Sequence, residues 1–150
     1  MKGRVVSVNV SEKKGVAKRP VAVLTLLPGR GVEGDAHAAP GDRQVSLLML
    51  ESIERARAGA ECQTSEGVDL VPGSYAENIT TSGIDLLALR LGDTLTAGVA
   101  RLRVTKIGKE CPRPCAIYYK LGSCIMPREG IFCEVLAGGE VRPGDEIATD

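Results

Sequence analysis

Glycine and proline punctuate the chain at intervals of about ten residues, which limits the length of any element between them. The 150 residues include 18 glycines and 8 prolines. The runs between these turns alternate in hydropathy or are rich in β-branched residues, as strands do. We predict strands at residues 3–10, 21–27, 77–81, 93–97, 101–107, 131–136 and 146–149. This pattern predicts a mostly-β fold, a closed or nearly closed β-barrel with a few peripheral helices.

Two segments have the features of helices. Residues 45–58 carry apolar side chains at a spacing of about 3.6, and Gly59 is placed to end the helix. Residues 114–120 begin with a proline, which is favoured at the first helical position. No internal repeat, low-complexity tract or linker divides the 150 residues. We therefore predict a single domain over residues 1–150.

Composition excludes several classes of protein. Lys and Arg total 19, as do Asp and Glu, so a strongly basic nucleic-acid-binding protein is disfavoured. Aromatic residues make up 3% of the chain and tryptophan is absent, which leaves little for a base-stacking surface. The longest apolar run is too short for a membrane span, and the first residues lack the features of a signal peptide. We therefore expect a cytoplasmic protein that contacts neither nucleic acid nor membrane.

The only histidine of the chain follows an aspartate in a glycine-rich loop, as Asp35-Ala36-His37, with Arg43 close behind. In an extended loop both side chains project to one side, so Asp35 would orient the His37 imidazole, or both would meet a metal or an anion. The same spacing is typical of a turn in which Asp35 caps backbone N–H groups and His37 is an ordinary surface residue. The pattern alone favours this second interpretation.

Glu77 and Asn78 follow the Pro72-Gly73 turn at the start of a predicted strand. They supply an ionised acceptor and an amide that both donates and accepts hydrogen bonds. Such a pair fixes the rim of a barrel as readily as it binds a substrate, and taken alone the structural role is favoured.

Cys115 has the surroundings of a reactive thiol. It would lie in the first turn of the 114–120 helix, where unpaired N–H groups and the helix dipole favour the thiolate. Lys109 and Arg113 add positive charge nearby, and the flanking prolines stiffen the loop. Cys133, by contrast, lies in an apolar strand, as inert cysteines do. We therefore expect Cys115 to be the reactive sulfur.

The five cysteines are an odd number, which favours free thiols, a metal site or one reactive sulfur over a disulfide framework. A structural zinc site is disfavoured because only Cys111 and Cys115 are closely spaced, with no second close pair. A redox pair of Cys111 and Cys115 remains an alternative, although three residues separate them where thioredoxin-type pairs have two.

The order and spacing of these clusters resemble those of the MOSC domain, the module named for the C-terminal part of molybdenum cofactor sulfurase. The resemblance runs from about residue 4 to residue 147. The matching segments are residues 34–37, 43–47, 73–79 and 91–93, the Cys115 loop, and residues 130–132, 138–139 and 143–145. The family is similar in being a mostly-β barrel, in agreement with the strand pattern.

The resemblance implies chemistry around sulfur and the molybdenum cofactor, a molybdopterin-type ligand. It implies that Cys115 is the sulfur-bearing residue, with Cys111 as an additional thiol. Carried over residue by residue, the set that would line the cofactor cleft is Asp35, His37, Arg43, Glu77 and Asn78. Lys109, Arg113 and Arg43 would hold the cofactor phosphate through charge-assisted hydrogen bonds.

We therefore expect a sulfur carrier in which Cys115 accepts sulfur as a persulfide and Cys111 resolves it as a disulfide. Larger relatives add a pyridoxal-phosphate aminotransferase-like part that this chain lacks. The sulfur would therefore come from a partner such as a cysteine desulfurase and pass to a molybdoenzyme or a cofactor-biosynthesis protein. Two alternatives remain: a non-catalytic cofactor-binding module, and a molybdenum-dependent reductase of N-hydroxylated compounds with Cys115 as metal ligand. The scarcity of aromatic residues favours a shallow cleft or a site shared in a homodimer.

Overall fold

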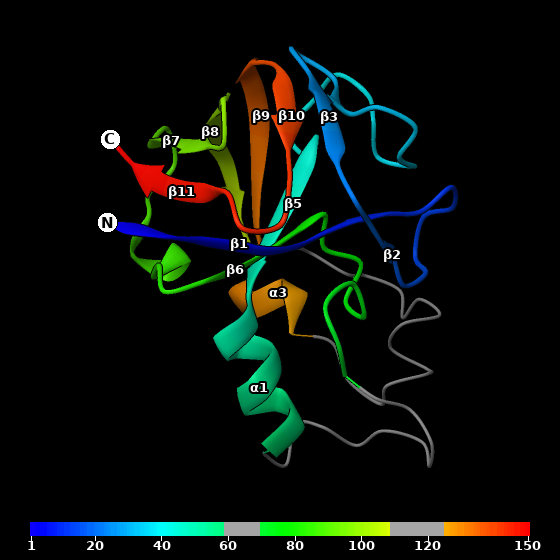
Figure 1. Ribbon diagram of the computed structural model, residues 1–150, viewed down its shortest axis with the longest axis vertical. Coiled ribbons are helices and arrows are strands. Elements are labelled where there is room, and N and C mark those ends of the chain that lie inside the picture. Colours follow the sequence, from blue (N-terminus) through cyan, green and yellow to red (C-terminus); the bar gives the residue numbers. More distant parts are fainter. Residues whose placement is uncertain (59–69, 109–124) are drawn as a thin grey trace.

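The computed structural model describes residues 1–58, 70–108 and 125–150, and these form a β-barrel with helices beside it (Figure 1). The barrel strands, in their order around the sheet, are β11 (Glu146–Thr149), β7 (Thr94–Ala97), β8 (Ala100–Ile107), β9 (Ile131–Ala137), β5 (Val45–Met49), β6 (Ile79–Ser82) and β1 (Lys2–Val10). The sheet closes because β11 also pairs with β1, where Lys2 lies opposite Ala148. The prediction of a mostly-β barrel is confirmed.

A smaller sheet lies beside the barrel, and one predicted strand is divided between the two. The predicted strand at 21–27 is in fact β2 (Arg19–Val21), which pairs with β1, and β3 (Leu24–Leu27). In the three-stranded sheet β3 lies between β10 (Gly139–Val141) and β4 (Gly31–Val32). The sequence did not predict β4 and β10, which are too short to show a pattern. The predicted strand at 77–81 begins later, at Ile79.

The prediction of one helix over residues 45–58 is wrong for its first part. Val45–Met49 is strand β5, and the helix α1 spans only Leu50–Ala58. All five residues of β5 are buried. Val45, Leu47 and Met49 face the barrel core, and Leu48 on the outer face packs in a second apolar cluster with residues of α1. A strand covered on both faces shows no alternation, and a short apolar run of this kind is ambiguous between strand and helix.

Helix α1 lies in the connection between β5 and β6, which pair in parallel. Parallel neighbours need such a crossover, because a tight turn reverses the chain. Ile53 and Ala56 of α1 pack with Tyr75, Phe132 and the short helix α3 (Met126–Glu129) in a second apolar cluster outside the barrel. In Figure 1 both helices lie at one end of the barrel. Three residues of this cluster, Tyr75, Met126 and Phe132, line the candidate site described below.

The remaining helical turn in the described chain is the 3₁₀ helix η1 (Leu86–Ala88), between β6 and β7. The helix predicted at 114–120 lies outside the described residues. Within those residues no helix has the length and apolar character of a membrane span.

Candidate functional site

Asp35 forms a buried ion pair with Lys18. Asp35 Oδ1 lies 2.8 Å from Lys18 Nζ, and neither side chain is exposed to solvent. The Asp35 carboxylate also accepts the backbone N–H bonds of Ser11 and His37, at 3.0 and 3.1 Å. Burial by itself raises the pKa of this carboxyl, but hydrogen bonding with His37, Lys18 and Ser11 and the positive charge of Lys18 together hold the pKa well below its usual range. Asp35 is therefore an ionised, buried group that holds the His37 loop in place through the His37 backbone N–H and the Lys18 ammonium.

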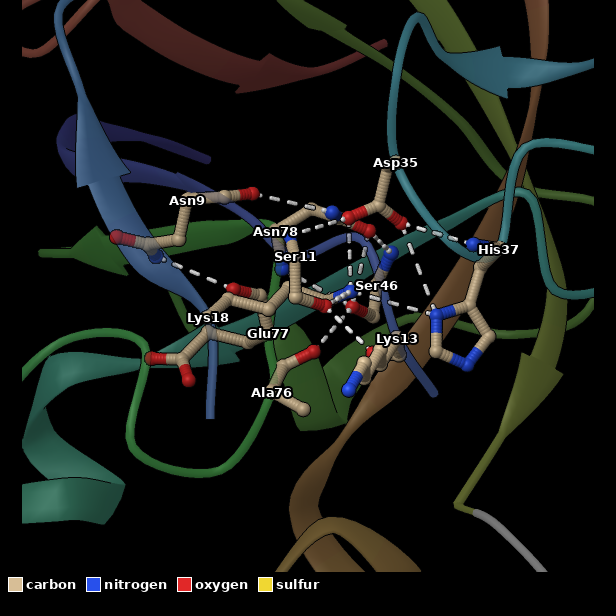
Figure 2. A network of polar contacts seen from close by, with 10 residues as sticks. All are labelled: Asn9, Ser11, Lys13, Lys18, Asp35, His37, Ser46, Ala76, Glu77 and Asn78. Carbon is tan, nitrogen blue, oxygen red and sulfur yellow. Dashed lines mark hydrogen bonds and ion pairs between the residues drawn. The ribbon is translucent and has the colours of Figure 1, made fainter. Parts of the chain in front are cut away.

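Lys18 Nζ lies at the centre of a polar network (Figure 2). Besides Asp35, it contacts the Ser11 hydroxyl at 3.0 Å and His37 Nδ1 at 3.3 Å. The side chain of His37 is 25% exposed, so its ring joins the buried network to the surface.

The turn at Gly73 fixes the backbone of Lys18. Lys18 donates its N–H to the Gly73 carbonyl at 2.8 Å. Gly73 has a φ of +92°, and a Cβ built there would lie 2.2 Å from the Lys18 carbonyl oxygen. Only glycine permits both this φ and this approach without displacing the backbone.

Asn78 ties three strands together. Its Oδ1 accepts from the backbone N–H and the hydroxyl of Ser46, at 3.1 and 3.2 Å, and its Nδ2 donates to the Asn9 carbonyl at 3.2 Å. These contacts join β5 to the ends of β1 and β6. The Asn78 amide is thus engaged within the protein, as the structural interpretation of the sequence expects.

Glu77 lies deeper, with no exposed surface. Thr80 donates its hydroxyl to Glu77 Oε2 at 2.7 Å, while Oε1 has no hydrogen-bond partner in the described part of the chain. Burial raises the pKa of Glu77, and nearby backbone N–H groups such as that of Gly73 offset only part of this effect. Glu77 therefore lies behind the site and not on its surface.

A pocket opens beside His37 at the end of the barrel that faces α3. Its described lining residues are Gly15, His37, Arg43, Ser46, Tyr75, Ala76, Asn78, Met126 and Phe132. Arg43 is the one residue of this lining with a full charge. Its guanidinium lies over the Phe132 ring, 5.7 Å from the ring centroid, and makes no ion pair or hydrogen bond with any described residue. The pocket therefore presents a positive charge on an apolar floor.

The structure brings together five of the residues that the sequence singles out. His37, Arg43 and Asn78 line the pocket, and Asp35 and Glu77 lie buried behind it. Cys115, Cys111, Lys109 and Arg113 lie outside the described residues, and their roles stay predictions. The described residues on either side of that segment meet at α3: a Cβ on Gly108 would lie 2.5 Å from the Pro127 carbonyl oxygen, and Met126 lines the pocket.

Cys133 is fully buried in the barrel core, as its apolar strand predicts. Burial raises the pKa of this thiol far above its ordinary range, which makes it a poor nucleophile. No three or more His, Cys, Asp and Glu side chains gather as a metal site within residues 1–58, 70–108 and 125–150.

Sequence reasoning did not find Lys18. It lies in a segment that also contains Lys13, Lys14 and Arg19, and no pattern distinguishes it from these exposed neighbours. Its burial depends on the Gly73 turn and the Asp35 loop, which are far from it in the sequence.

Comparisons with known proteins agree with this fold. Among solved structures, the YuaD protein from Bacillus subtilis superposes with a TM-score of 0.76 at 23% identity, over 98% of this chain and 94% of that one. YiiM from Escherichia coli gives 0.71 at 21% identity, over 100% and 70%, and YiiM from Geobacillus stearothermophilus gives 0.71 at 22%, over 99% and 75%. At such identities the likeness concerns the fold alone. A comparison with curated protein sequences found no match. The family model of the MOSC domain matches residues 33–148, and the chain therefore belongs to the MOSC domain family.

Proposed function

We propose that this protein carries sulfur for molybdenum-cofactor chemistry as a persulfide on Cys115, and that it holds the anionic end of the cofactor beside His37 and Arg43. The MOSC family is associated with the molybdenum cofactor. The observation that carries the proposal is the pocket, in which the guanidinium of Arg43 has no protein counter-charge in the described part of the chain.

The described lining fits the phosphate end of a molybdopterin-type cofactor. Phe132 supports the face of the Arg43 guanidinium, which leaves its N–H edge for a phosphate that accepts two parallel hydrogen bonds. The side chain of His37 is partly exposed and adds a ring nitrogen to the pocket. The amide of Asn78 is hydrogen-bonded to Ser46 and Asn9, so Asn78 only lines the pocket. Lys109 and Arg113 would add further positive charge. The cofactor itself would supply a molybdenum centre, the destination of the sulfur.

The sulfur-loading step needs only Cys115 and a donor persulfide, such as that of a cysteine desulfurase. The Cys115 thiolate attacks the terminal sulfur of the donor; a new S–S bond forms on Cys115, and the donor cysteine leaves as a thiolate. Lys109 and Arg113 would stabilise the attacking thiolate. Cys111 would discharge an unused persulfide by attacking the inner sulfur of Cys115, which forms a disulfide and releases hydrosulfide. A molybdoenzyme or a cofactor-biosynthesis protein would receive the sulfur.

Persulfide labelling tests this proposal. The protein is incubated with a cysteine desulfurase and cysteine, and persulfide is detected by mass spectrometry of alkylated peptides. We expect the label on wild type and on the Cys133→Ala control, because Cys133 is buried in the barrel core, and its loss from Cys115→Ser. Unchanged labelling of Cys115→Ser would end the sulfur-carrier proposal.

Cofactor retention separates the two alternatives. Molybdenum is measured by elemental analysis of protein from a cofactor-competent host. Equal molybdenum in wild type and Cys115→Ala, with no sulfur transfer by either, would indicate a non-catalytic binding module. Loss of molybdenum in Cys115→Ala would instead favour Cys115 as a metal ligand. Under either alternative, Arg43→Gln should lower the amount of molybdenum retained, because the charge of Arg43 has no partner in the described part of the protein.

A further inference from the structure

The ammonium of Lys18 contacts acceptors from three described residues, one of which is the His37 ring. Nζ lies 2.8 Å from Asp35 Oδ1, 3.0 Å from Ser11 Oγ and 3.3 Å from His37 Nδ1. The Ser11 hydroxyl donates its own proton to the Lys13 carbonyl at 2.9 Å, so it accepts from Lys18. An ammonium has three N–H bonds and no lone pair, so Lys18 donates in all three contacts.

A hydrogen bond from Lys18 to His37 Nδ1 requires that Nδ1 accepts it and carries no proton. A neutral imidazole then has its proton on Nε2. The competing partner is Asp35 Oδ2, which lies 3.7 Å from Nδ1, beyond hydrogen-bond distance. That oxygen instead accepts the backbone N–H of His37 at 3.1 Å. Figure 2 shows the second ring nitrogen pointing away from the network.

We propose that Lys18 is a positioning residue that fixes His37 as an Nε2–H donor, so that His37 and Arg43 together form an oxyanion subsite in the pocket. This inference rests on the proposed function in one respect, since the phosphate of the cofactor is the oxyanion that the site would take there. Both residues line the same pocket, and no carboxylate belongs to its described lining.

The tautomer decides what the ring does. With the proton on Nε2, the exposed edge of His37 donates a hydrogen bond to an oxyanion. With the proton on Nδ1, the same edge would present a lone pair, suited to a metal ion or to accepting a proton. The buried ammonium thus selects a donor for anions over a base or a metal ligand.

Nitrogen NMR of the imidazole tests the tautomer directly. The chain contains one histidine, so long-range proton–nitrogen correlation of ¹⁵N-labelled protein gives one assignable ring. At neutral pH we expect Nε2 to have the shift of a protonated ring nitrogen and Nδ1 that of an unprotonated one. The reverse pattern, with Nδ1 protonated, would overturn the proposal without any variant.

Lys18→Met tests the cause of the tautomer. Without the ammonium, ionised Asp35 is the nearest partner of the ring, so we expect the proton to move to Nδ1. Lys14→Met is the matched control, because Lys14 is exposed and close in sequence, and it should leave the His37 spectrum unchanged. A folded Lys18→Met variant with the wild-type His37 spectrum would show that Lys18 does not fix the ring. If Lys18→Met does not fold, the wild-type spectrum still shows which ring nitrogen of His37 carries the proton and so tests the proposal.

Inorganic phosphate tests the subsite. Titration should shift the Nε2 resonance of wild type, and Arg43→Gln should weaken phosphate binding about tenfold while keeping the tautomer. A wild-type spectrum that does not respond to phosphate would overturn the subsite. Persulfide labelling of Cys115 is independent of these measurements, so the sulfur-carrier proposal and the present one fail separately.

Discussion

Loss of the Lys18 ammonium should destabilise the fold far more than loss of an exposed cation. The ion pair with Asp35 spans 2.8 Å, and neither side chain has exposed surface. In Lys18→Met the Asp35 carboxylate stays buried and keeps only the N–H groups of Ser11 and His37. Removal of one partner from a buried pair costs about 3–5 kcal/mol, and we expect a loss of that size in the free energy of unfolding.

A double-mutant cycle separates the charge effect from packing. Lys18→Met/Asp35→Asn removes both charges, while the side-chain oxygen of the introduced amide still accepts a backbone N–H. Replacement of a whole buried pair by neutral groups costs much less than removal of one member. We therefore expect the double variant to be more stable than the sum of the two single losses predicts, with a coupling of about 2 kcal/mol.

Urea denaturation followed by far-UV circular dichroism measures these losses, since the chain has no tryptophan to report by fluorescence. Arg142→Met is the control: Arg142 pairs with Glu140 at 3.2 Å, with 55% and 53% of their side chains exposed. That variant should lose about 0–1 kcal/mol. If Lys18→Met costs no more than Arg142→Met, or if the cycle is additive, the buried pair does not anchor the loop.

The same pair has a defined pH dependence. The pKa of Asp35 in the folded protein lies below its ordinary value of 3.8, so the unfolded chain takes up the proton first as pH falls. Its contribution to stability is complete above that ordinary value and is lost as pH falls through the folded-state pKa. Asp35→Asn should lack this part of the acid destabilisation, which acid titration at fixed urea measures.

Two further variants test the buried surroundings of the site. The pKa of Glu77 is raised above 4.5 by burial, so wild type should lose stability as pH rises from that value toward the folded-state pKa. Glu77→Gln should therefore gain stability relative to wild type as pH rises above 4.5, and thermal melts at increasing pH with no such gain would contradict the buried carboxyl. Gly73→Ala places a Cβ 2.2 Å from the Lys18 carbonyl oxygen, whereas Gly29→Ala, at φ +69°, meets no atom within 4 Å. We expect Gly73→Ala to lower the free energy of unfolding by about 3 kcal/mol and Gly29→Ala to lower it by about 1 kcal/mol. Equal losses in urea denaturation would show that the clash at Gly73 is relieved.

The sequence predicts the barrel because its strands have one buried face and end at glycine or proline. Leu102 and Val104 of β8, for example, are buried while Arg101 and Arg103 are exposed, as the alternation indicates. The prediction fails at β5, where both faces are covered and no alternation exists. It also fails at β4, whose two residues are too few to form a pattern.

The sequence also identifies much of the pocket. His37 and Arg43 come from the same loop region and line the same pocket, and Asn78 joins them because β6 runs beside β5. Lys18 could not be found in this way. A lysine among other basic residues looks exposed unless its long-range partners are known, and the partner here is an aspartate whose own pattern is that of a capping residue.

The spacing of Asp35 and His37 left two interpretations open, and the structure contains elements of both. Asp35 does cap backbone N–H groups, those of Ser11 and His37. The His37 ring is also held in place, but the group at hydrogen-bond distance from Nδ1 is Lys18 and not Asp35. An ammonium and a carboxylate impose opposite tautomers on the ring that they contact. The presence of an Asp-x-His pair therefore says little about what its histidine does until the third residue, contributed by a distant segment, is known.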